Sequence, residues 1–405
     1  MGTKKAAWTL VVVMAAGAPL RAQTFGDDVA FLQKHAAVMV LADPKTGARV
    51  AVCPDLQGRV MTSGTGGDPG PSFGWVNREL IASGRRDPHF NPYGGEDRFW
   101  LGPEGGQYAL FFKKGDPFDL DHWFTPAAID TEPYEVAGRA EDRVQFRKDM
   151  SLVNAAGTRF DIRLDRRVRL VPAAEAWPDL GLPEAPGVTV VAFESENRIT
   201  NTGAAAWKKD TGLVSVWILG MFRPTPSTTV VVPFKPGPES TRGPAVNDAY
   251  FGKVPPDRLV VRDRVLFFRG DGERRAKIGI PPARALPVLG SYDARNRVLT
   301  IVQFSRDEGA DVDYVNSMWE IQARPYGGDV VNSYNDGPPA PGAKPLGPFY
   351  ELETSSPAAA LAPAASLVHR QRTLHLVGDR PGLDRVARRL LGASLAEIEA
   401  AFPAP

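Results

Sequence analysis

The densest group of polar and aromatic side chains in the sequence is the segment NPYGGEDRFWLGPEGGQ, residues 91–107. Glu96, Arg98 and Trp100 occur at every second position, so their side chains share one face if the segment is extended. Glu96 and Arg98 offer charge-assisted hydrogen bonds to hydroxyl groups, while Trp100 and Tyr93 offer flat faces for stacking on a sugar ring. The glycines allow the backbone to approach a ligand closely. These residue types predict a carbohydrate site; a buried Glu–Arg pair that braces a loop is the alternative.

A second candidate is the segment DLDHW, residues 119–123. His122 titrates near neutral pH and can serve as a general acid or base, and Asp119 or Asp121 could orient its ring. Adjacent residues of a strand point to opposite faces, so a structural or merely exposed histidine explains the segment equally well.

Asn332, Tyr334 and Asp336 alternate within DVVNSYNDGP, residues 329–338, and are expected to line one side of a cleft. The Asn-Asp-Gly sequence at 335–337 is also an ordinary turn signal. Calcium requires six to eight oxygen ligands, which is more than this segment supplies. We therefore expect no metal site.

Glu351 and Glu353 lie two residues apart in FYELETSSP, and this spacing places both carboxylates on one face of a strand. Paired carboxylates divide into an acid and a base where their environments differ. His369 and His375 lie on the next predicted strand and could face the pair. Exposed carboxylates at a sheet edge are the alternative.

Several classes of protein lack support in the sequence. It contains no G-x-S-x-G elbow, P-loop, H-E-x-x-H motif or dinucleotide-binding G-x-G-x-x-G, and its five histidines have no zinc-site spacing. The charges nearly balance, with 48 Lys and Arg against 47 Asp and Glu. We therefore expect no cofactor and no nucleic-acid partner.

The elements that position these residues are predicted to be β-strands. The 405 residues include 40 glycines and 37 prolines, which interrupt helices and favour many short strands joined by turns. Apolar residues recur with a period of two from Val144 to Leu170. Further strands are expected at 37–42, 49–53, 59–63, 188–194, 196–200, 212–219, 230–233, 264–268, 298–304, 317–322, 349–354 and 366–376. Short helices are expected at 28–35 and in two pieces after 381, where apolar residues take helical spacing.

Residues 1–22 have the pattern of a signal peptide. Lys4 and Lys5 precede an uncharged stretch that is too short to span a membrane comfortably, and Ala22 suits cleavage before Gln23. A retained N-terminal anchor is the alternative. No later apolar stretch is long enough for a membrane span, so an exported protein, periplasmic or extracellular, is expected. Cys53, the only cysteine, lies in an apolar run and is expected to be a buried small hydrophobe.

Three segments resemble galactose-mutarotase-like proteins: VAVCPDLQGRVM at 50–61, ESENRITNTG at 194–203, and ALAPAAS at 360–366 with the His-containing strand that follows. The segments 94–107, 330–337 and 350–357 resemble, more specifically, an uncharacterised family of exported bacterial proteins placed in that fold. The order of these segments along the chain carries the resemblance.

This resemblance implies a mainly antiparallel, all-β supersandwich of about 20 strands with short N- and C-terminal helices. From the residue patterns described above we expect a signal peptide at 1–22, one β-domain at 23–380, and a helical segment at 381–405 packed on the same domain. The resemblance also implies that the concave face of a sheet binds a mono- or oligosaccharide.

Mutarotases use a histidine general acid on the strand after the mid-chain Asn. Here that strand, GLVSVWILG at 212–220, contains no histidine. Trp217 stands near the expected place and offers stacking, so aldose 1-epimerase activity is not expected. The resemblance implies that Glu351 takes the place of the glutamate base.

We therefore predict an exported carbohydrate-binding or carbohydrate-processing protein. The alternatives are a polysaccharide lyase or glycoside hydrolase on the same scaffold, or a non-catalytic envelope or binding protein. Glu96, Arg98, Trp100, His122 and Asp336 are predicted to converge on one cleft. The candidate catalytic residues are Glu96, His122 and Glu351, and the candidate binding residues are Tyr93, Arg98, Trp100, Trp217, Asn332, Tyr334 and Asp336.

Overall fold

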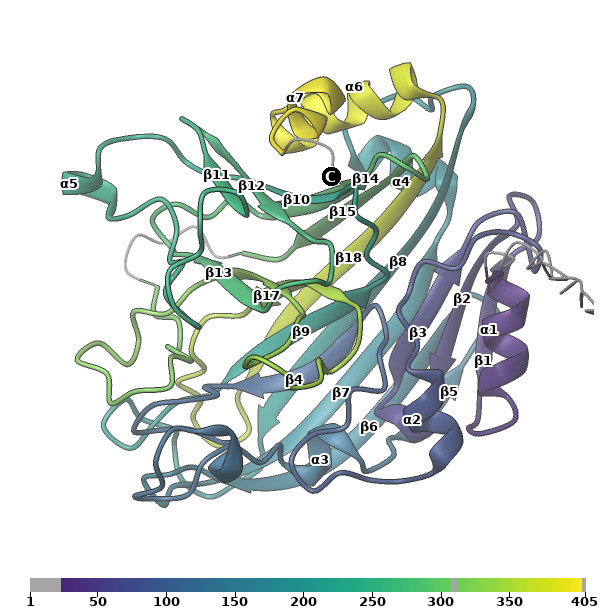
Figure 1. Ribbon diagram of the computed structural model, residues 1–405. Helices are drawn as coiled ribbons and strands as arrows, with labels where there is room; N and C mark the ends of the chain where they lie inside the picture. Colours follow the sequence, from purple (N-terminus) through teal and green to yellow (C-terminus); the bar gives the residue numbers. More distant parts are fainter. Residues whose placement is uncertain (1–22, 307–311, 403–405) are drawn as a thin grey trace, which may run out of the picture.

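The computed structural model describes residues 23–306 and 312–402. The predicted signal peptide, residues 1–22, lies outside the described residues. The described chain forms antiparallel sheets of ten, five and three strands, with short helices around them (Figure 1). The prediction of a mainly antiparallel β-fold with short helices near both ends is confirmed.

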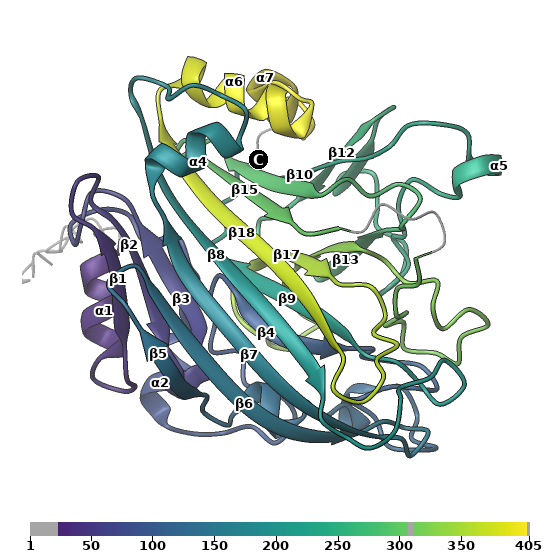
Figure 2. The same ribbon diagram turned by 180° about the vertical axis from the view of Figure 1, so that it is seen from behind.

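The ten-stranded sheet runs through the whole molecule (Figure 2). In spatial order its strands are β11 (Leu259–Val261), β12 (Val265–Arg269), β10 (Thr228–Pro233), β14 (Val288–Asp293), β15 (Val298–Phe304), β18 (Ser366–Gly378), β8 (Val188–Asn201), β7 (Arg159–Val171), β6 (Arg143–Val153) and β5 (Glu135–Arg139). In β7, Phe160, Ile162 and Leu164 are fully buried, while Arg159 and Arg163 are exposed. The period of two in the sequence therefore reflects a sheet with one face in the core.

The five-stranded sheet lies over the ten-stranded sheet and consists of β13 (Ala276–Ile280), β16 (Val331–Asn335), β17 (Tyr350–Ser355), β9 (Ser215–Phe222) and β4 (Arg98–Gly102). Strand β17 shows how its two faces differ. The hydroxyl groups of Tyr350 and Ser291 of β14 are 2.8 Å apart, and Thr354 Oγ1 lies 2.8 Å from His369 Nε2 of β18. Glu351, between these two residues, therefore points away from the ten-stranded sheet.

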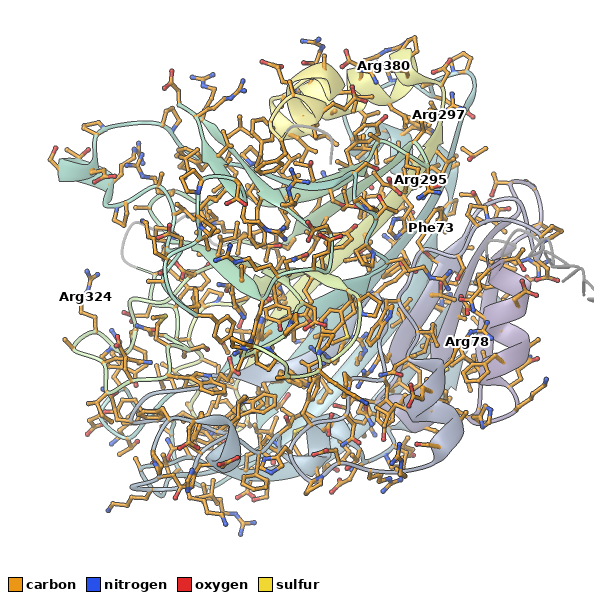
Figure 3. All side chains as sticks on the ribbon, in the orientation of Figure 1. Phe73, Arg78, Arg295, Arg297, Arg324 and Arg380 are labelled. Atoms are coloured by element: carbon orange, nitrogen blue, oxygen red, sulfur yellow. The ribbon has the colours of Figure 1, made fainter. Side chains whose placement is uncertain are left out.

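The three-stranded sheet is formed by β1 (Met39–Asp43), β2 (Ala48–Cys53) and β3 (Arg59–Gly64). The short helices are α1 (Phe25–Leu32), α2 (Arg78–Ser83), α3 (Ala127–Asp130), α4 (Ala173–Asp179) and α5 (Glu239–Arg242), with 3-10 turns η1 (Pro54–Leu56) and η2 (Leu120–His122). Cys53 is fully buried between β2 and η1. Side chains fill the space between the ribbons, while Arg324 projects outward from a loop (Figure 3).

Helices α6 (Arg380–Leu391) and α7 (Leu395–Glu399) pack against one end of the ten-stranded sheet (Figure 1). Leu383 and Ile398 are buried in one apolar cluster with Val231 of β10 and Leu376 of β18. Apolar residues at helical spacing after residue 381 thus pack the two helices onto the ten-stranded sheet rather than forming a separate body.

Some predicted elements differ from the structure. The predicted strand at 317–322 is wrong: the segment is irregular, and Gln322 Nε2 donates to the carbonyl oxygens of Asn316 and Met318. The predicted strands at 188–194 and 196–200 form the single strand β8. Helix α1 begins three residues earlier than predicted, because Thr24 and Asp27 form a capping box.

The two larger sheets are joined by a buried ion pair. Arg166 Nη2 of β7 lies 2.6 Å from Asp97 Oδ1, next to β4, and both side chains are completely inaccessible to solvent. Ser195 Oγ of β8 also donates to Asp97 at 2.8 Å, and Arg166 Nε donates to the carbonyl oxygen of Gly58 at 3.1 Å. The pair is well hydrogen-bonded, as a buried pair must be to offset its desolvation.

Replacing Arg166 with Met is expected to lower the free energy of unfolding by about 3–5 kcal/mol, because Asp97 would remain as a buried charge without its cation. Arg163→Met on the same strand is the control. Arg163 pairs with Asp149 on the surface, and such pairs contribute less than about 1 kcal/mol. Urea unfolding followed by tryptophan fluorescence measures both. Equal losses in the two variants would contradict the role assigned to the buried pair.

Candidate functional site

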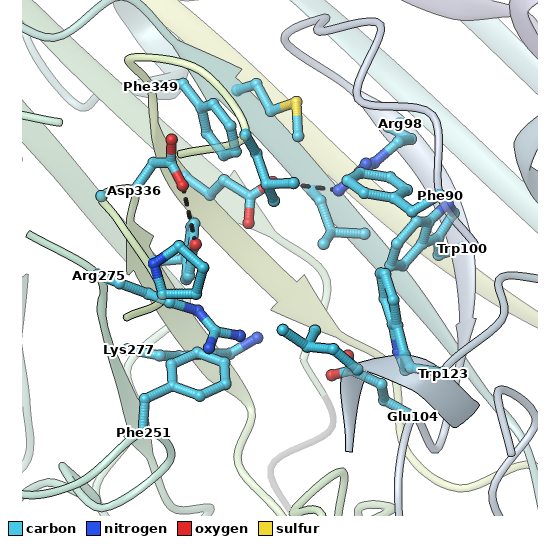
Figure 4. A pocket seen from close by; sticks show the side chains of 18 of the residues that line it. Phe90, Arg98, Trp100, Glu104, Trp123, Phe251, Arg275, Lys277, Asp336 and Phe349 are labelled. Atoms are coloured by element: carbon cyan, nitrogen blue, oxygen red, sulfur yellow. Dashed lines mark hydrogen bonds and ion pairs between the residues drawn. The ribbon is translucent and has the colours of Figure 1, made fainter. Parts of the chain in front are cut away.

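A cavity of about 130 Å³ lies on the face of the five-stranded sheet that points away from the ten-stranded sheet (Figure 4). Every strand of the sheet contributes to its lining: Arg98 and Trp100 from β4, Trp217, Leu219 and Met221 from β9, Lys277 from β13, Tyr334 from β16, and Glu351 from β17. Loops between the strands complete the walls. The volume is close to that of an engineered cavity of about 150 Å³ that accepts benzene, so it accommodates one six-membered ring.

One wall of the cavity is aromatic. The ring centroids of Trp100 and Trp217 lie 5.5 Å apart in an edge-on arrangement, and Phe90 packs edge-on against Trp100 at 5.4 Å. Trp123 and Trp319, from two loops, extend this wall, with centroids 5.9 Å apart. Large flat apolar surfaces bind ligands that also present flat apolar faces.

A buried ion pair forms part of the floor. Arg98 Nη2 lies 3.1 Å from Glu351 Oε1, and the side chains are only 2% and 7% exposed. The Arg98 guanidinium stacks over the Trp100 ring at 4.1 Å, as expected for residues two apart on one strand face. Arg98 Nε and Nη1 have no hydrogen-bond partner among the described residues. A ligand oxygen would supply the missing acceptor.

Two carboxyl groups at the cavity have pKa values close to neutrality. Burial raises the pKa of Glu351 to about 8, against the opposing effect of Arg98. Burial also raises the pKa of Asp336 to about 6, although Asp336 accepts hydrogen bonds from Gly347 N and Tyr334 Oη at 2.8 and 3.0 Å. Tyr334 pairs with Glu351 in the register of β16 and β17, so Asp336 is a diagonal neighbour of Glu351. At neutral pH one carboxyl can donate a proton and the other can accept one.

A second buried pair lies beside this floor. Lys277 Nζ is 3.0 Å from Glu353 Oε2, which also accepts a hydrogen bond from Trp217 Nε1 at 2.9 Å. The ammonium group lies 4.7 Å from the centre of the Trp217 ring. Burial raises the pKa of Glu104, on the opposite wall, while Lys277 opposes that effect. Lys277 is therefore held in place by the ion pair with Glu353 and by the cation–π contact with Trp217.

The structure places six of the ten predicted site residues around this cavity, namely Arg98, Trp100, Trp217, Tyr334, Asp336 and Glu351. Asn332 lies beside it, where its amide nitrogen donates to Tyr250 Oη and to the carbonyl oxygen of Ile278, each at 3.1 Å. Tyr93 does not reach the cavity. Its ring is buried elsewhere, under the guanidinium of Arg59 at 5.7 Å.

Glu96 is not brought to the cavity. It precedes β4, and its backbone N–H donates to the carbonyl oxygen of Val60. Its carboxylate accepts hydrogen bonds from the backbone N–H and the hydroxyl group of Ser63, and it lies 2.8 Å from His375 Nε2. The expected alternation with Arg98 therefore does not extend to residue 96.

His122 also lies outside the cavity. It ends the 3-10 turn η2, its side chain is 41% exposed, and its Nδ1 is 2.6 Å from Asp119 Oδ1. The adjacent residues Leu120 and Trp123 line the cavity instead. Neither Glu96 with His122 nor Glu351 with His369 forms an acid–base pair. Glu96 is bonded to Ser63 and His375, and Thr354, which contacts His369, faces away from Glu351.

Four further residues line the cavity that were not predicted from the sequence: Arg275, Lys277, Phe251 and Trp319. Arg275 and Lys277 alternate at the start of β13, so the same spacing argument that identified Arg98 and Trp100 applied to them. Phe251 and Trp319 lie in loops outside the named strands, where spacing does not indicate direction.

Over residues 23–402 the sequence matches the model of a family of unknown function, DUF6786. The chain belongs to this family. A comparison with curated proteins finds no match.

Among solved structures, a putative aldose 1-epimerase from Escherichia coli K12 is similar, with a TM-score of 0.50 and 10% identity over 85% of this chain and 99% of that one. The Slr1438 protein from Synechocystis sp. PCC 6803 matches with a TM-score of 0.49 and 14% identity, over 85% and 96% of the two chains. A galactose mutarotase-like protein from Lactobacillus casei ATCC 334 matches with a TM-score of 0.47 and 9% identity, over 84% and 100%. The fold is galactose-mutarotase-like, as the sequence resemblance implied.

Within 23–306 and 312–402, no helix is long and apolar enough to cross a membrane. In the same part of the chain, no group of three or more His, Cys, Asp or Glu side chains is arranged to hold a metal ion.

The raised pKa of Glu351 predicts a pH dependence of stability. Its ordinary pKa is 4.5 and its pKa in the folded protein is about 8, so between these values the folded protein keeps a proton that the unfolded chain releases. The contribution of Glu351 to the free energy of unfolding is therefore lost as pH rises from about 4.5 through about 8. The Glu351→Gln variant should lack this part of the decline.

Thermal unfolding across that pH range measures the difference between wild type and Glu351→Gln. Glu320→Gln, a change of an exposed residue in a loop, is the control and should follow the wild-type curve. A constant difference between wild type and Glu351→Gln at every pH would contradict the raised pKa.

Proposed function

We propose that the protein binds a carbohydrate in the cavity on the outward face of the five-stranded sheet. The observation that carries this proposal is the combination of a tryptophan wall with buried polar groups at the same small cavity. The faces of Trp100 and Trp217 suit the apolar face of a sugar ring. Arg98, Glu351 and Asp336 suit its hydroxyl groups, because charge-assisted hydrogen bonds are the stronger kind.

The similar structure named as a putative aldose 1-epimerase points to the same class of ligand. Mutarotation itself is not proposed, because Trp217 occupies the strand where mutarotases carry their histidine acid. The indole N–H of Trp217 is engaged by Glu353, so it is not free to transfer a proton. A non-catalytic sugar-binding protein and a sugar-processing enzyme both fit this description of the cavity.

One observation favours an enzyme as the second candidate function. Glu351 and Asp336 are diagonal neighbours with pKa values of about 8 and about 6. A protonated Glu351 would act as the general acid and an ionised Asp336 as the general base, the division of roles that carbohydrate-cleaving enzymes use. A lyase or a glycoside hydrolase is the class of enzyme that this pair supports.

Sugar binding is tested by isothermal titration of the protein with neutral and acidic mono- and oligosaccharides. Trp319→Leu should weaken binding about tenfold, since a stacking surface would be lost; this corresponds to about 1.4 kcal/mol. His122→Ala, outside the cavity, is the control and should bind as tightly as wild type. No heat of binding with any sugar at millimolar concentration would refute the proposal.

The enzymatic alternative is tested with oligosaccharides that bind in the titration. Products are followed by a reducing-end assay for hydrolysis and by ultraviolet absorbance of unsaturated ends for a lyase. Glu351→Gln and Asp336→Asn should each lower kcat by at least about 100-fold while binding persists. Unchanged turnover in both variants would exclude this acid–base pair.

We further propose that the protein is exported to the periplasm or beyond, on the basis of the basic, uncharged and small-residue pattern of residues 1–22. Expression of the full chain in a bacterial host, followed by mass spectrometry of the periplasmic protein, tests this. The expected N-terminal residue is Gln23. A cytoplasmic protein that retains Met1 would contradict export.

A further inference from the structure

The cavity has a cationic wall opposite its tryptophan wall. In Figure 4, Arg275 and Lys277 lie across the cavity from Trp100 and Trp123. Lys277 belongs to β13 and Arg275 immediately precedes that strand, so both point to one face. Lys344, from the loop before β17, is also at this cavity.

The cations of the cavity differ in their partners. Arg98 is paired with Glu351 and Lys277 with Glu353. Arg275 and Lys344 form no ion pair with any residue of the described chain. Two positive groups at the cavity are therefore left for a ligand.

The guanidinium of Arg275 is held in place without using its hydrogen-bond donors. Its Cζ lies 3.7 Å from the centre of the Phe251 ring, a cation–π contact that leaves the N–H groups at the edge of the plane unused. A planar guanidinium fixed in this way matches two oxygens of a carboxylate or phosphate. Phe251 therefore orients Arg275 toward an anion.

Two of the three acids that line the cavity have partners other than Arg275 and Lys344, while the third, Glu104, is stabilised in its charged form by the nearby positive charges of Lys277 and Arg275. Glu351 faces Arg98, and Asp336 accepts its hydrogen bonds from Tyr334 and the backbone of residue 347. Neither Arg275 nor Lys344 thus has a carboxylate within ion-pair distance among the described residues.

We propose that the carbohydrate bound here carries an anionic group, a carboxylate or a phosphate, that is held by Arg275 and Lys344 while its ring stacks on the tryptophan wall. This inference rests on the proposed function and names the class of ligand. The ligand is expected to be a sugar that carries one anionic group. Uronic acids and sugar phosphates are the two classes of sugar with this chemistry.

The test is isothermal titration of the full protein with matched pairs: glucuronate against glucose, galacturonate against galactose, and glucose 6-phosphate against glucose. Inorganic phosphate and acetate are probes for the charge alone. At least one acidic sugar should bind ten or more times more tightly than its neutral partner. The ratio of the two affinities will be larger either for the uronates or for the phosphate ester. The larger ratio identifies whether the anionic group is a carboxylate or a phosphate.

Arg275→Gln should remove the preference for the acidic sugar over its neutral partner. Arg274→Gln, an adjacent exposed arginine that does not line the cavity, should retain the preference. Lys344→Gln, on an exposed loop, should also reduce the preference for the acidic sugar. This variant provides the test if Arg275→Gln fails to fold.

Three results would overturn the inference. Equal affinities for the acidic and the neutral sugar within every pair would show that the cavity does not recognise an anionic group. The proposal that the cavity binds a sugar would then still stand. An equal loss of preference in Arg274→Gln and Arg275→Gln would show an effect of overall charge. Binding of inorganic phosphate or acetate without binding of any sugar would also contradict the proposed function.

Discussion

Three consecutive charged side chains, Glu96, Asp97 and Arg98, are buried. The arrangement of the sheets depends on a separate partner for each of these side chains. Each contacts another strand: Glu96 lies beside His375 of β18, Asp97 pairs with Arg166 of β7, and Arg98 pairs with Glu351 of β17. The hydroxyl group of Ser63 in β3 donates a hydrogen bond to Glu96, which connects the three-stranded sheet to the same segment. An unpaired buried charge costs several kcal/mol, so a shift of this segment by one residue would leave three charges without partners. The segment therefore fixes how all three sheets meet.

The same segment determines which side chains reach the candidate site. Because Asp97 points toward the ten-stranded sheet, Arg98 and Trp100 point to the opposite face. The neighbouring strands follow the same alternation, so Trp217 and Glu351 meet Arg98 and Trp100 on that face. Burial under the loops then excludes water, which raises the pKa of Glu351. An ion pair needed for folding and a carboxyl suited to proton transfer thus arise from one arrangement of strands.

Regular alternation is the part of this structure that can be predicted from the sequence. It correctly indicated strands β6 and β7. It also predicted that Tyr334 and Asp336 share one face, and that Arg98 and Trp100 share one face, and all four line the cavity. Strands β4 and β16 were not predicted as strands, because every residue in both is buried, whether polar or apolar, and burial of both faces hides the period of two. Glu96 and His122 lie outside regular strands, and their directions depend on tertiary contacts with Ser63, His375 and Asp119. The pairing of distant charges, such as Lys277 with Glu353, has no local signal.

A crystal structure of the protein with galacturonate or an oligosaccharide would show directly where a sugar binds. We expect electron density for a sugar ring against Trp100 and Trp217, with oxygens in hydrogen-bond reach of Arg98 and an anionic group at Arg275. A different cavity, of about 450 Å³ and lined by His375, Thr300 and Arg223, lies elsewhere in the described chain. A ligand bound only in that second cavity, with water alone between Arg98 and Arg275, would contradict the account.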